Sequence, residues 1–352
     1  MAKRLWVGLD VGVDTTSVCV IDTDGAVLRE TVCPTDAKSV HREIVSLGCR
    51  RSGVVGLEAG TGSALARELR ALGYTVEIYE TRQLSKFLRV RRNKTDAGDA
   101  LGIAHAGRIA SPLVSRVHLK SMECQSIASR LRIRRYFVKS RMNATNIVRQ
   151  QLQLYGVRIA TGNPATFHAR VDKALTTTFR CGSDPLEGEI RHLIDHIEEL
   201  RAYKKSLDRE LNSLALGIDI CRRLMEIPGV GPICALTFYA AVGEPDRFRR
   251  PSDIGPYLGL TPKLHQSGQA QRSGRISRMG NSMARALLIQ TSIRFMRSCD
   301  PQSRFKAWTA EIESRRGKGK SRVALARKLA TVMIAMWKRG TTFDPQIPLA
   351  AR

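Results

Sequence analysis

The 352-residue sequence lacks the signatures of a zinc site, a disulfide framework and a membrane span. Its eight cysteines form no Cys-x-x-Cys pair and follow no regular spacing, so we expect reduced, mostly buried thiols. No run of about 18 apolar residues occurs. The amino terminus passes directly into an apolar segment containing Asp10, which is not the pattern of a signal peptide. These absences predict a cytoplasmic protein without a membrane partner.

Acidic residues are scarce relative to basic ones. The chain has 58 Lys and Arg against 32 Asp and Glu, which gives a net charge of +26. Residues 81–151 carry 16 basic and 3 acidic side chains, and residues 262–352 carry 19 and 4, whereas residues 1–80 carry 9 and 11. A surplus of this size indicates a polyanionic partner, of which nucleic acid is the first candidate. We therefore expect two basic segments that grip a polyanion, beside a slightly acidic amino-terminal segment.

The amino-terminal segment predicts a mixed α/β domain. Apolar runs separated by a Gly/Asp/Thr turn predict two hairpin-connected strands within 4–22, and a third strand at 26–32. The later elements are a helix at 37–47, a strand that carries Glu58, a helix at 62–72 and a strand at 74–79. Three antiparallel strands, helix, strand, helix and strand is the order of the ribonuclease H-like fold.

Four carboxylates stand out against this order. Asp10 lies in the first strand and Glu58 in the fourth, while Asp96 and Asp99 follow Thr95, a plausible helix cap. A carboxylate in a buried strand is costly unless it is paired or binds a cation. Four carboxylates can hold one or two Mg²⁺ ions, or Mn²⁺ in their place, and two such ions can assist in-line phosphoryl transfer. The alternative is a strand-end carboxylate satisfied by turn amides, with two ordinary first-turn acids.

The next segments predict helices and nucleic-acid contacts. The basic run that includes Arg91, Arg92 and Lys94 supplies phosphate contacts or a solvated face. Residues 121–155 predict one long basic helix, 156–185 a loop-rich insertion, and 186–216 a near-heptad apolar stripe. The stripe fits a coiled coil with a second protomer and an intrachain helical hairpin equally well. His192 and His196 are four apart on it and are expected to be solvated.

Two further stretches are suited to phosphate. Gly229 and Gly231 lie in a Pro-Gly-Val-Gly turn, which can offer backbone amides to a phosphate or serve only as a packing turn. The polar stretch before a helix that begins near Asn281 contains three arginines beside several serines. A serine beside phosphate-binding arginines can act as a nucleophile, and spacing does not choose among the candidates. The arginines are Arg272, Arg275 and Arg278, and the serines are Ser267, Ser273, Ser277 and Ser282.

Several blocks together carry a family resemblance. They are GLDVGVDTT at 8–16, GLEAGTG at 56–62, NKTDAGDA at 93–100, IPGVGPICA at 227–235, and GLTPKLHQSG followed by GRISRMGNSMARALL between 259 and 288. In order and spacing they resemble the DEDD transposases of bacterial insertion sequences that work with a bridge RNA. The departures, Gly-Thr-Gly after Glu58 and a long 156–185 segment, affect interdomain geometry rather than catalytic groups.

The resemblance implies an α/β plus α architecture with three parts. Residues 1–155 would form a RuvC-like (ribonuclease H-like) DEDD domain ending in the long basic helix, 156–217 a linker and coiled coil, and 218–352 a mainly helical transposase domain. The metal ligands would be Asp10, Glu58, Asp96 and Asp99, and the nucleophile Ser267, which would form a covalent phosphoserine with DNA.

The resemblance also implies the partners. A non-coding bridge RNA would pair with donor and target double-stranded DNA and so select the sequences joined. The protein would act as a homo-oligomer, a dimer that becomes a tetramer on DNA, in which one protomer's RuvC-like domain and another's serine domain build a composite site. We expect it in the bacterial cytoplasm, associated with the nucleoid.

Three other functions fit parts of the sequence. A RuvC-like junction nuclease would use the four carboxylates and water without needing Ser267. An actin-like kinase would share the GLDVGVDTT loop, but a second phosphate loop and a Gly-Gly adenosine site are missing from the sequence. A non-enzymatic RNA-binding protein would use the acids structurally and would bind RNA without cleaving any strand.

Overall fold

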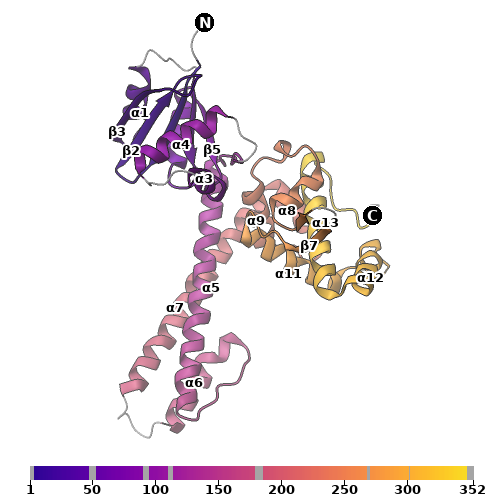
Figure 1. Ribbon diagram of the computed structural model, residues 1–352. Coiled ribbons are helices and arrows are strands. Elements are labelled where there is room, and N and C mark those ends of the chain that lie inside the picture. Colours follow the sequence, from indigo (N-terminus) through magenta and orange to yellow (C-terminus); the bar gives the residue numbers. More distant parts are fainter. Residues whose placement is uncertain are drawn as a thin grey trace. The chain divides into compact units, whose positions relative to one another are not determined.

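The computed structural model describes residues 4–46, 53–89, 95–109, 114–178, 185–267, 270–300 and 302–346 (Figure 1). The chain divides into two compact units, the first ending at Leu119 and the second beginning at Lys120. Within the described ranges, no helix has both the length and the apolar character to cross a membrane.

The first unit is a five-stranded sheet with helices on both faces. Its strands lie in the order β3-β2-β1-β4-β5, with β1 antiparallel to β2 and parallel to β4. The predicted succession of strands and helices is confirmed, and α3 is an addition. The elements are β1 (Trp6–Val11), β2 (Thr15–Ile21), β3 (Val27–Pro34), α1 (Ala37–Val45), β4 (Val54–Glu58), α2 (Ser63–Ala71), β5 (Thr75–Tyr79), α3 (Thr81–Leu88) and α4 (Asp96–Arg108).

Successive side chains of the central strands point to opposite faces of the sheet. Val7 and Leu9 of β1 are buried in the cluster that includes the apolar residues of α1 and α2. Cys19 and Ile21 of β2 instead pack against Ala100 of α4. Helices α1 and α2 therefore cover one face and α4 the other.

The second unit is mainly helical. Its elements are α5 (Met122–Leu154), η1 (Pro164–Thr166), α6 (Phe167–Thr178), α7 (Pro185–Gly217), α8 (Asp219–Met225), α9 (Pro232–Val242), η2 (Pro245–Arg247), η3 (Pro251–Asp253), α10 (Ile254–Tyr257), β6 (Pro262–Ser267), β7 (Ala270–Ile276), α11 (Ser282–Ser298), α12 (Arg304–Arg316) and α13 (Lys318–Arg339). The long basic helix predicted for 121–155 is confirmed as α5.

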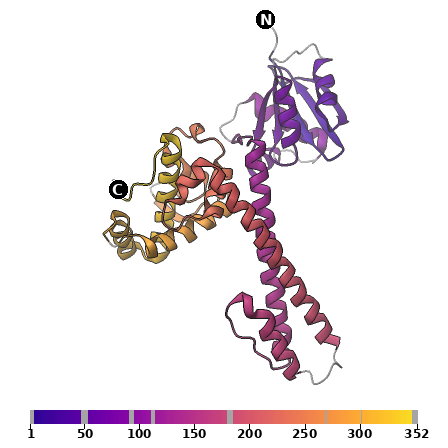
Figure 2. The same ribbon diagram turned by 180° about the vertical axis from the view of Figure 1, so that it is seen from behind.

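Helices α5 and α7 form an antiparallel pair within the chain. Leu131 near the start of α5 shares a buried cluster with Leu211 near the end of α7, and Val148 shares another with Ile194. The two helices run side by side in both views (Figure 2). The apolar stripe of α7 thus packs against α5 of the same chain. This is the intrachain helical hairpin, one of the two predicted alternatives.

The prediction of a loop-rich segment at 156–185 is wrong for its middle. Residues 167–178 form α6, whose Phe167, Val171 and Leu175 are buried against the distal ends of α5 and α7. These three residues are spaced four apart, so they line one face of a helix. Burial of that face stabilises the helix. The helical pattern is hard to see in the sequence because Gly, Pro and Thr residues surround it.

The other end of the α5–α7 pair is built into the main helical core. Leu224, Leu236, Leu288, Phe305 and Met333 come from α8, α9, α11, α12 and α13 and are all buried there. The six described cysteines are buried and free of disulfides, as predicted. Cys49 and Cys181 lie outside the described residues.

Candidate active site

Asp10 and Glu58 occupy neighbouring positions on adjacent parallel strands. The register pairs Gly8 with Gly56 and Leu9 with Leu57, so the next residues along the two strands are Asp10 and Glu58. Leu9 and Leu57 are buried on the face covered by α1 and α2. Because side chains alternate along a strand, Asp10 and Glu58 belong to the opposite face, which α4 covers.

Helix α4 crosses this face in the direction opposite to β1. A Cβ atom built on Gly8 would lie 1.9 Å from the Ala100 carbonyl oxygen, and one built on Gly107 would lie 3.3 Å from Trp6 Cδ1. The carboxyl end of α4 is therefore near the start of β1, and its amino end is near Asp10. The missing side chain at Gly8 is what allows the helix to approach so closely.

The first turn of α4 carries the other two carboxylates. Thr95 caps the helix as predicted, because its Oγ1 accepts a hydrogen bond of 3.1 Å from the Gly98 amide. Asp96 is exposed and Asp99 is half-buried, and their spacing of three places them on one face of the helix. All four predicted carboxylates therefore come from the same corner of the first unit.

The side chains of this corner match Mg²⁺ in the type of donor atom that they carry. Carboxylate oxygens are the ligands that hard divalent cations prefer. Asp10 and Glu58 are half-buried beside the helix terminus. Within the described residues, no three His, Cys, Asp or Glu side chains are close enough together to hold a metal.

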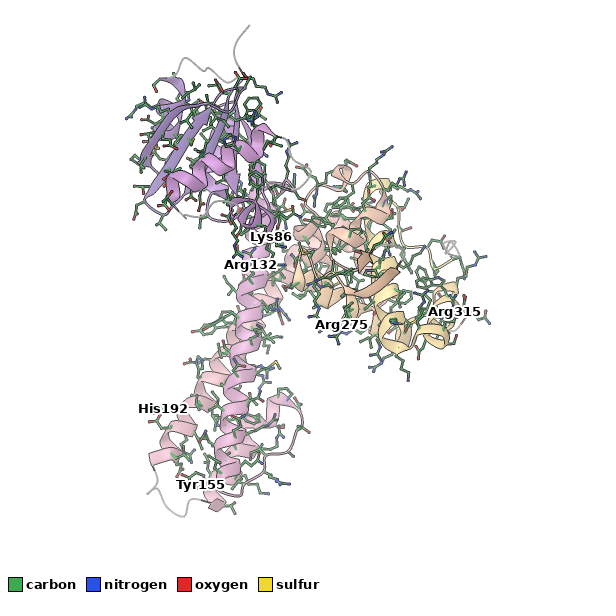
Figure 3. All side chains as sticks on the ribbon, in the orientation of Figure 1. Lys86, Arg132, Tyr155, His192, Arg275 and Arg315 are labelled. Carbon is green, nitrogen blue, oxygen red and sulfur yellow. The ribbon has the colours of Figure 1, made fainter. Side chains whose placement is uncertain are left out.

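The predicted serine lies on a β-hairpin, formed by the residues that the sequence showed only as a polar stretch before a helix. Ser267 is the last residue of β6 and pairs with Ala270 of β7. The side chains of Ser267 and Arg272 lie outside the described part of the structure, whereas Arg275 and Arg278 are exposed (Arg275 is labelled in Figure 3). Ser267 therefore ends the first strand of a ribbon whose second strand carries Arg272 and Arg275.

The base of this hairpin is fixed by a buried arginine. The Arg285 guanidinium donates hydrogen bonds of 2.9 Å to the Leu258 carbonyl and 2.8 Å to the Met279 carbonyl, which flank the hairpin in the sequence. Burial lowers the pKa of Arg285, and nearby Arg278 adds to the effect. Arg285 does not stand out in the sequence, because its two carbonyl partners are set by the folded structure.

Glycines complete the same junction. A Cβ atom on Gly259 would lie 2.3 Å from the Met279 carbonyl oxygen, and one on Gly280 would lie 2.0 Å from the Tyr257 carbonyl oxygen. Both residues have positive φ angles, and so does Arg278 (φ 57°), whose carbonyl carbon would lie 2.9 Å from the same Gly259 Cβ. The two strands therefore leave the helical core through a tightly packed base. We call this base, residues 257–259 with 278–280, the neck of the hairpin.

The remaining predicted contact residues have different surroundings. Gly229 has φ +83° and packs against Arg294 and Phe295 of α11, which fits the packing-turn alternative. Gly231 begins α9 and has open space where a Cβ would be. The Asn281 side-chain oxygen caps α11 by accepting from the Met283 and Ala284 amides. Arg91, Arg92 and Lys94 lie outside the described residues.

The two histidines of α7 are exposed, as predicted. His196 lies 3.7 Å from Glu199, and neither His196 nor His192 (labelled in Figure 3) belongs to a metal-binding group among the residues described.

Comparison with protein families gives two matches. Residues 7–157 match a family described as "Transposase", of the DEDD type of IS110 elements. Residues 221–307 match the family described as "Transposase IS116/IS110/IS902 family". The first match contains the four carboxylates, and the second contains the hairpin with Ser267 and Arg285.

Whole-length relatives agree with these matches. A probable family 20 transposase of Pseudomonas aeruginosa is 32% identical over 297 residues, which is 83% of this chain and 86% of the relative. The transposase for insertion sequence element IS1111A of Coxiella burnetii is 30% identical over 96% of this chain and 90% of its own length. A putative transposase (y4pF/y4sB) of Sinorhizobium fredii is 29% identical over 298 residues, 82% of this chain and 74% of its own.

Proposed function

Because the chain belongs to the IS116/IS110/IS902 family of transposases, enzymes that cleave and rejoin DNA, we propose that it is an RNA-guided recombinase acting through a phosphoserine at Ser267. The main support is the convergence of Asp10 and Glu58 with the first turn of α4. The order β3-β2-β1-β4-β5 with β1 parallel to β4 also supports a RuvC-like fold for the first unit.

The four carboxylates are proposed to hold Mg²⁺. Asp10 and Glu58 would bind from the strands, and Asp96 and Asp99 from the helix. When bound, the ions would stabilise the charge on the entering and leaving oxygens of the phosphoryl transfer. Half-burial of Asp10, Glu58 and Asp99 limits competition from water at these oxygens.

Ser267 is proposed to carry the covalent step. Its Oγ would form a bond to the scissile phosphorus, and the bond from that phosphorus to one DNA ester oxygen would break. The leaving oxygen would take a proton and become a hydroxyl. A hydroxyl of the second DNA would then attack the phosphoserine, which releases Ser267 and joins the strands. One phosphodiester is exchanged for another, so the step needs no external energy source.

The positive charge supports a large nucleic-acid ligand. Residues 81–151 and 262–352 carry most of the surplus, and each is large enough to neutralise many phosphates. The proposed partners are a non-coding bridge RNA with donor and target DNA. A dimer that forms a tetramer on DNA would bring the carboxylates of one protomer to the Ser267 of another.

A covalent-trapping assay tests this proposal. The full-length protein is mixed with the RNA from its flanking element, Mg²⁺ and labelled donor and target DNA, and a denaturation-resistant protein–DNA adduct is measured. Ser267→Ala and Asp10→Ala should both abolish the adduct, as should omission of RNA or Mg²⁺. Ser273→Ala, on the opposite strand of the same hairpin, is the matched control and should retain it.

The other outcomes separate the alternatives. Cleavage without an adduct, retained in Ser267→Ala, would identify a metal-dependent nuclease that uses water. An adduct lost in Ser273→Ala instead of Ser267→Ala would reassign the nucleophile. Adduct formation without RNA would remove the guide from the proposal and leave the serine chemistry.

A further inference from the structure

A cavity of about 290 Å³ lies in the second unit between the first half of α5, α9 and the start of α11. Three of its lining residues are the cations Lys120, Arg132 and Arg135, and its lining includes no acidic and no aromatic side chain. The polar residues Thr237, Asn281 and Ser282 belong to the same lining. This chemistry suits an anion.

The arginines of the cavity differ from their neighbours on α5. Arg134 forms an ion pair of 2.5 Å with Asp208 of α7, and Arg130 is paired with Glu210. Within the described ranges, Arg132 and Arg135 have no carboxylate at ion-pair distance. The arginines on the α7 side of α5 are therefore neutralised by carboxylates of α7. The arginines on the cavity side keep their positive charge (Arg132 is labelled in Figure 3).

The other walls add to the positive potential. Helix α11 has 17 residues, and its amino end forms part of the cavity lining. This end is the positive end of the helix dipole. Lys120 donates a hydrogen bond of 2.6 Å to the Ala240 carbonyl, which fixes the ammonium at the wall. Burial lowers the pKa of Lys120, and the charges of Arg247 and Arg132 lower it further. A bound anion would relieve this repulsion.

We propose that this cavity binds a backbone phosphate of DNA, between Arg132, Arg135 and the start of α11. The position is informative because Asn281, at the cavity wall, follows the turn that leaves the serine hairpin. A phosphate held here would fix the DNA strand relative to β6 and β7. The inference rests on the proposed function only for the alignment of the DNA strand with the serine hairpin. A transposase must bind DNA whatever the chemistry of cleavage.

Binding of a labelled DNA duplex over a series of salt concentrations, without Mg²⁺, is the test. Arg132→Gln with Arg135→Gln should weaken binding about tenfold to a hundredfold. The same pair should reduce the slope of log K against log salt by about 0.9 for each phosphate that the protein no longer neutralises. The matched control is Lys139→Gln with Lys205→Gln, which removes two exposed cations of α5 and α7 outside the cavity and should change the slope less.

A second variant does not depend on removing arginine. Ser282→Asp puts a carboxylate at the exposed first residue of α11, where negative charge favours the helix, so the protein should fold at least as well and bind DNA less tightly. Ser213→Asp adds the same charge on the exposed side of α7 and should leave binding near that of the wild type.

The outcomes are distinct. Wild-type affinity and slope in both cavity variants would overturn the proposal. A loss confined to an RNA hairpin tested in parallel would also overturn it, and would assign the cavity to RNA. Because no strand is cut in this assay, failure of the Ser267 adduct would refute the proposed function without affecting the binding result.

Discussion

Arg285 is predicted to hold the serine hairpin in place, and its replacement by methionine tests this. Arg285→Met keeps an unbranched side chain but removes the donors to the Leu258 and Met279 carbonyls. Hydrogen bonds from a charged group contribute about 1.5–3 kcal/mol each. Arg285 is only 9% exposed, so relief of the desolvation of its guanidinium offsets part of that loss. We expect local opening of the neck to become easier by about 2–3 kcal/mol.

Amide hydrogen exchange measures this opening directly. The Ser277 amide donates a hydrogen bond of 2.8 Å to the Thr261 carbonyl, across the base of the hairpin. A destabilisation of about 2–3 kcal/mol should speed its exchange by about 30- to 150-fold. Arg297→Met, an exposed position on the same helix, should leave the rate unchanged, and Arg285→Lys should lie between. Equal rates in Arg285→Met and the wild type would refute the assignment of Arg285 as the clamp.

Three further predictions concern stability and reactivity. Gly8→Ala should lower the free energy of unfolding, measured by urea denaturation, by about 2–3 kcal/mol, because its Cβ would meet the backbone of Ala100 and Ala104. Gly188→Ala is the control: this position of α7 has open space for a Cβ, so the substitution should stabilise the protein by about 0.5–1 kcal/mol. Burial raises the pKa of Asp208, but hydrogen bonds from Arg134 and Lys204 outweigh it, so the pKa is lowered. Asp208→Asn should therefore cost about 1 kcal/mol at pH 7. The cost should shrink below about pH 4, where the carboxylate of the unfolded chain is protonated first and the native carboxylate, with its lowered pKa, only at lower pH; an equal cost at pH 3 would contradict this. Burial raises the pKa of Cys221 to about 12 and of Cys234 to about 11, so both should resist iodoacetamide at pH 8 until the protein is unfolded, and rapid labelling of the native protein would count against the burial.

The sheet and its carboxylates could be predicted because local patterns determine them. Alternating apolar residues and Gly/Asp turns mark the strands, and the order of strands and helices limits how they can pair. Asp10 and Glu58 fall at equivalent places in two strands, so parallel pairing brings them together. The helix that brings Asp96 and Asp99 was also visible from its Thr95 cap.

The serine hairpin could not be predicted in the same way. Residues of β6 and β7 are polar on both faces, so the alternation that reveals a strand is missing. The ribbon is held at its neck by Arg285, Gly259 and Gly280, whose contacts join positions distant in sequence. Such contacts leave no local periodicity. The cavity at Arg132 was hidden for the same reason, because its walls come from three helices.

The stripe on α7 limits how copies of this chain can associate. A heptad pattern states that a helix has an apolar face, but it does not identify the partner. Here Ile190, Ile194 and Leu211 are already buried, in clusters shared with α5 and α6 of the same chain. A second protomer could use these residues only by separating α5 from α7 and exposing both core clusters, together with the Arg134–Asp208 ion pair. An oligomer that leaves this unit folded must therefore be built without Ile190, Ile194 and Leu211.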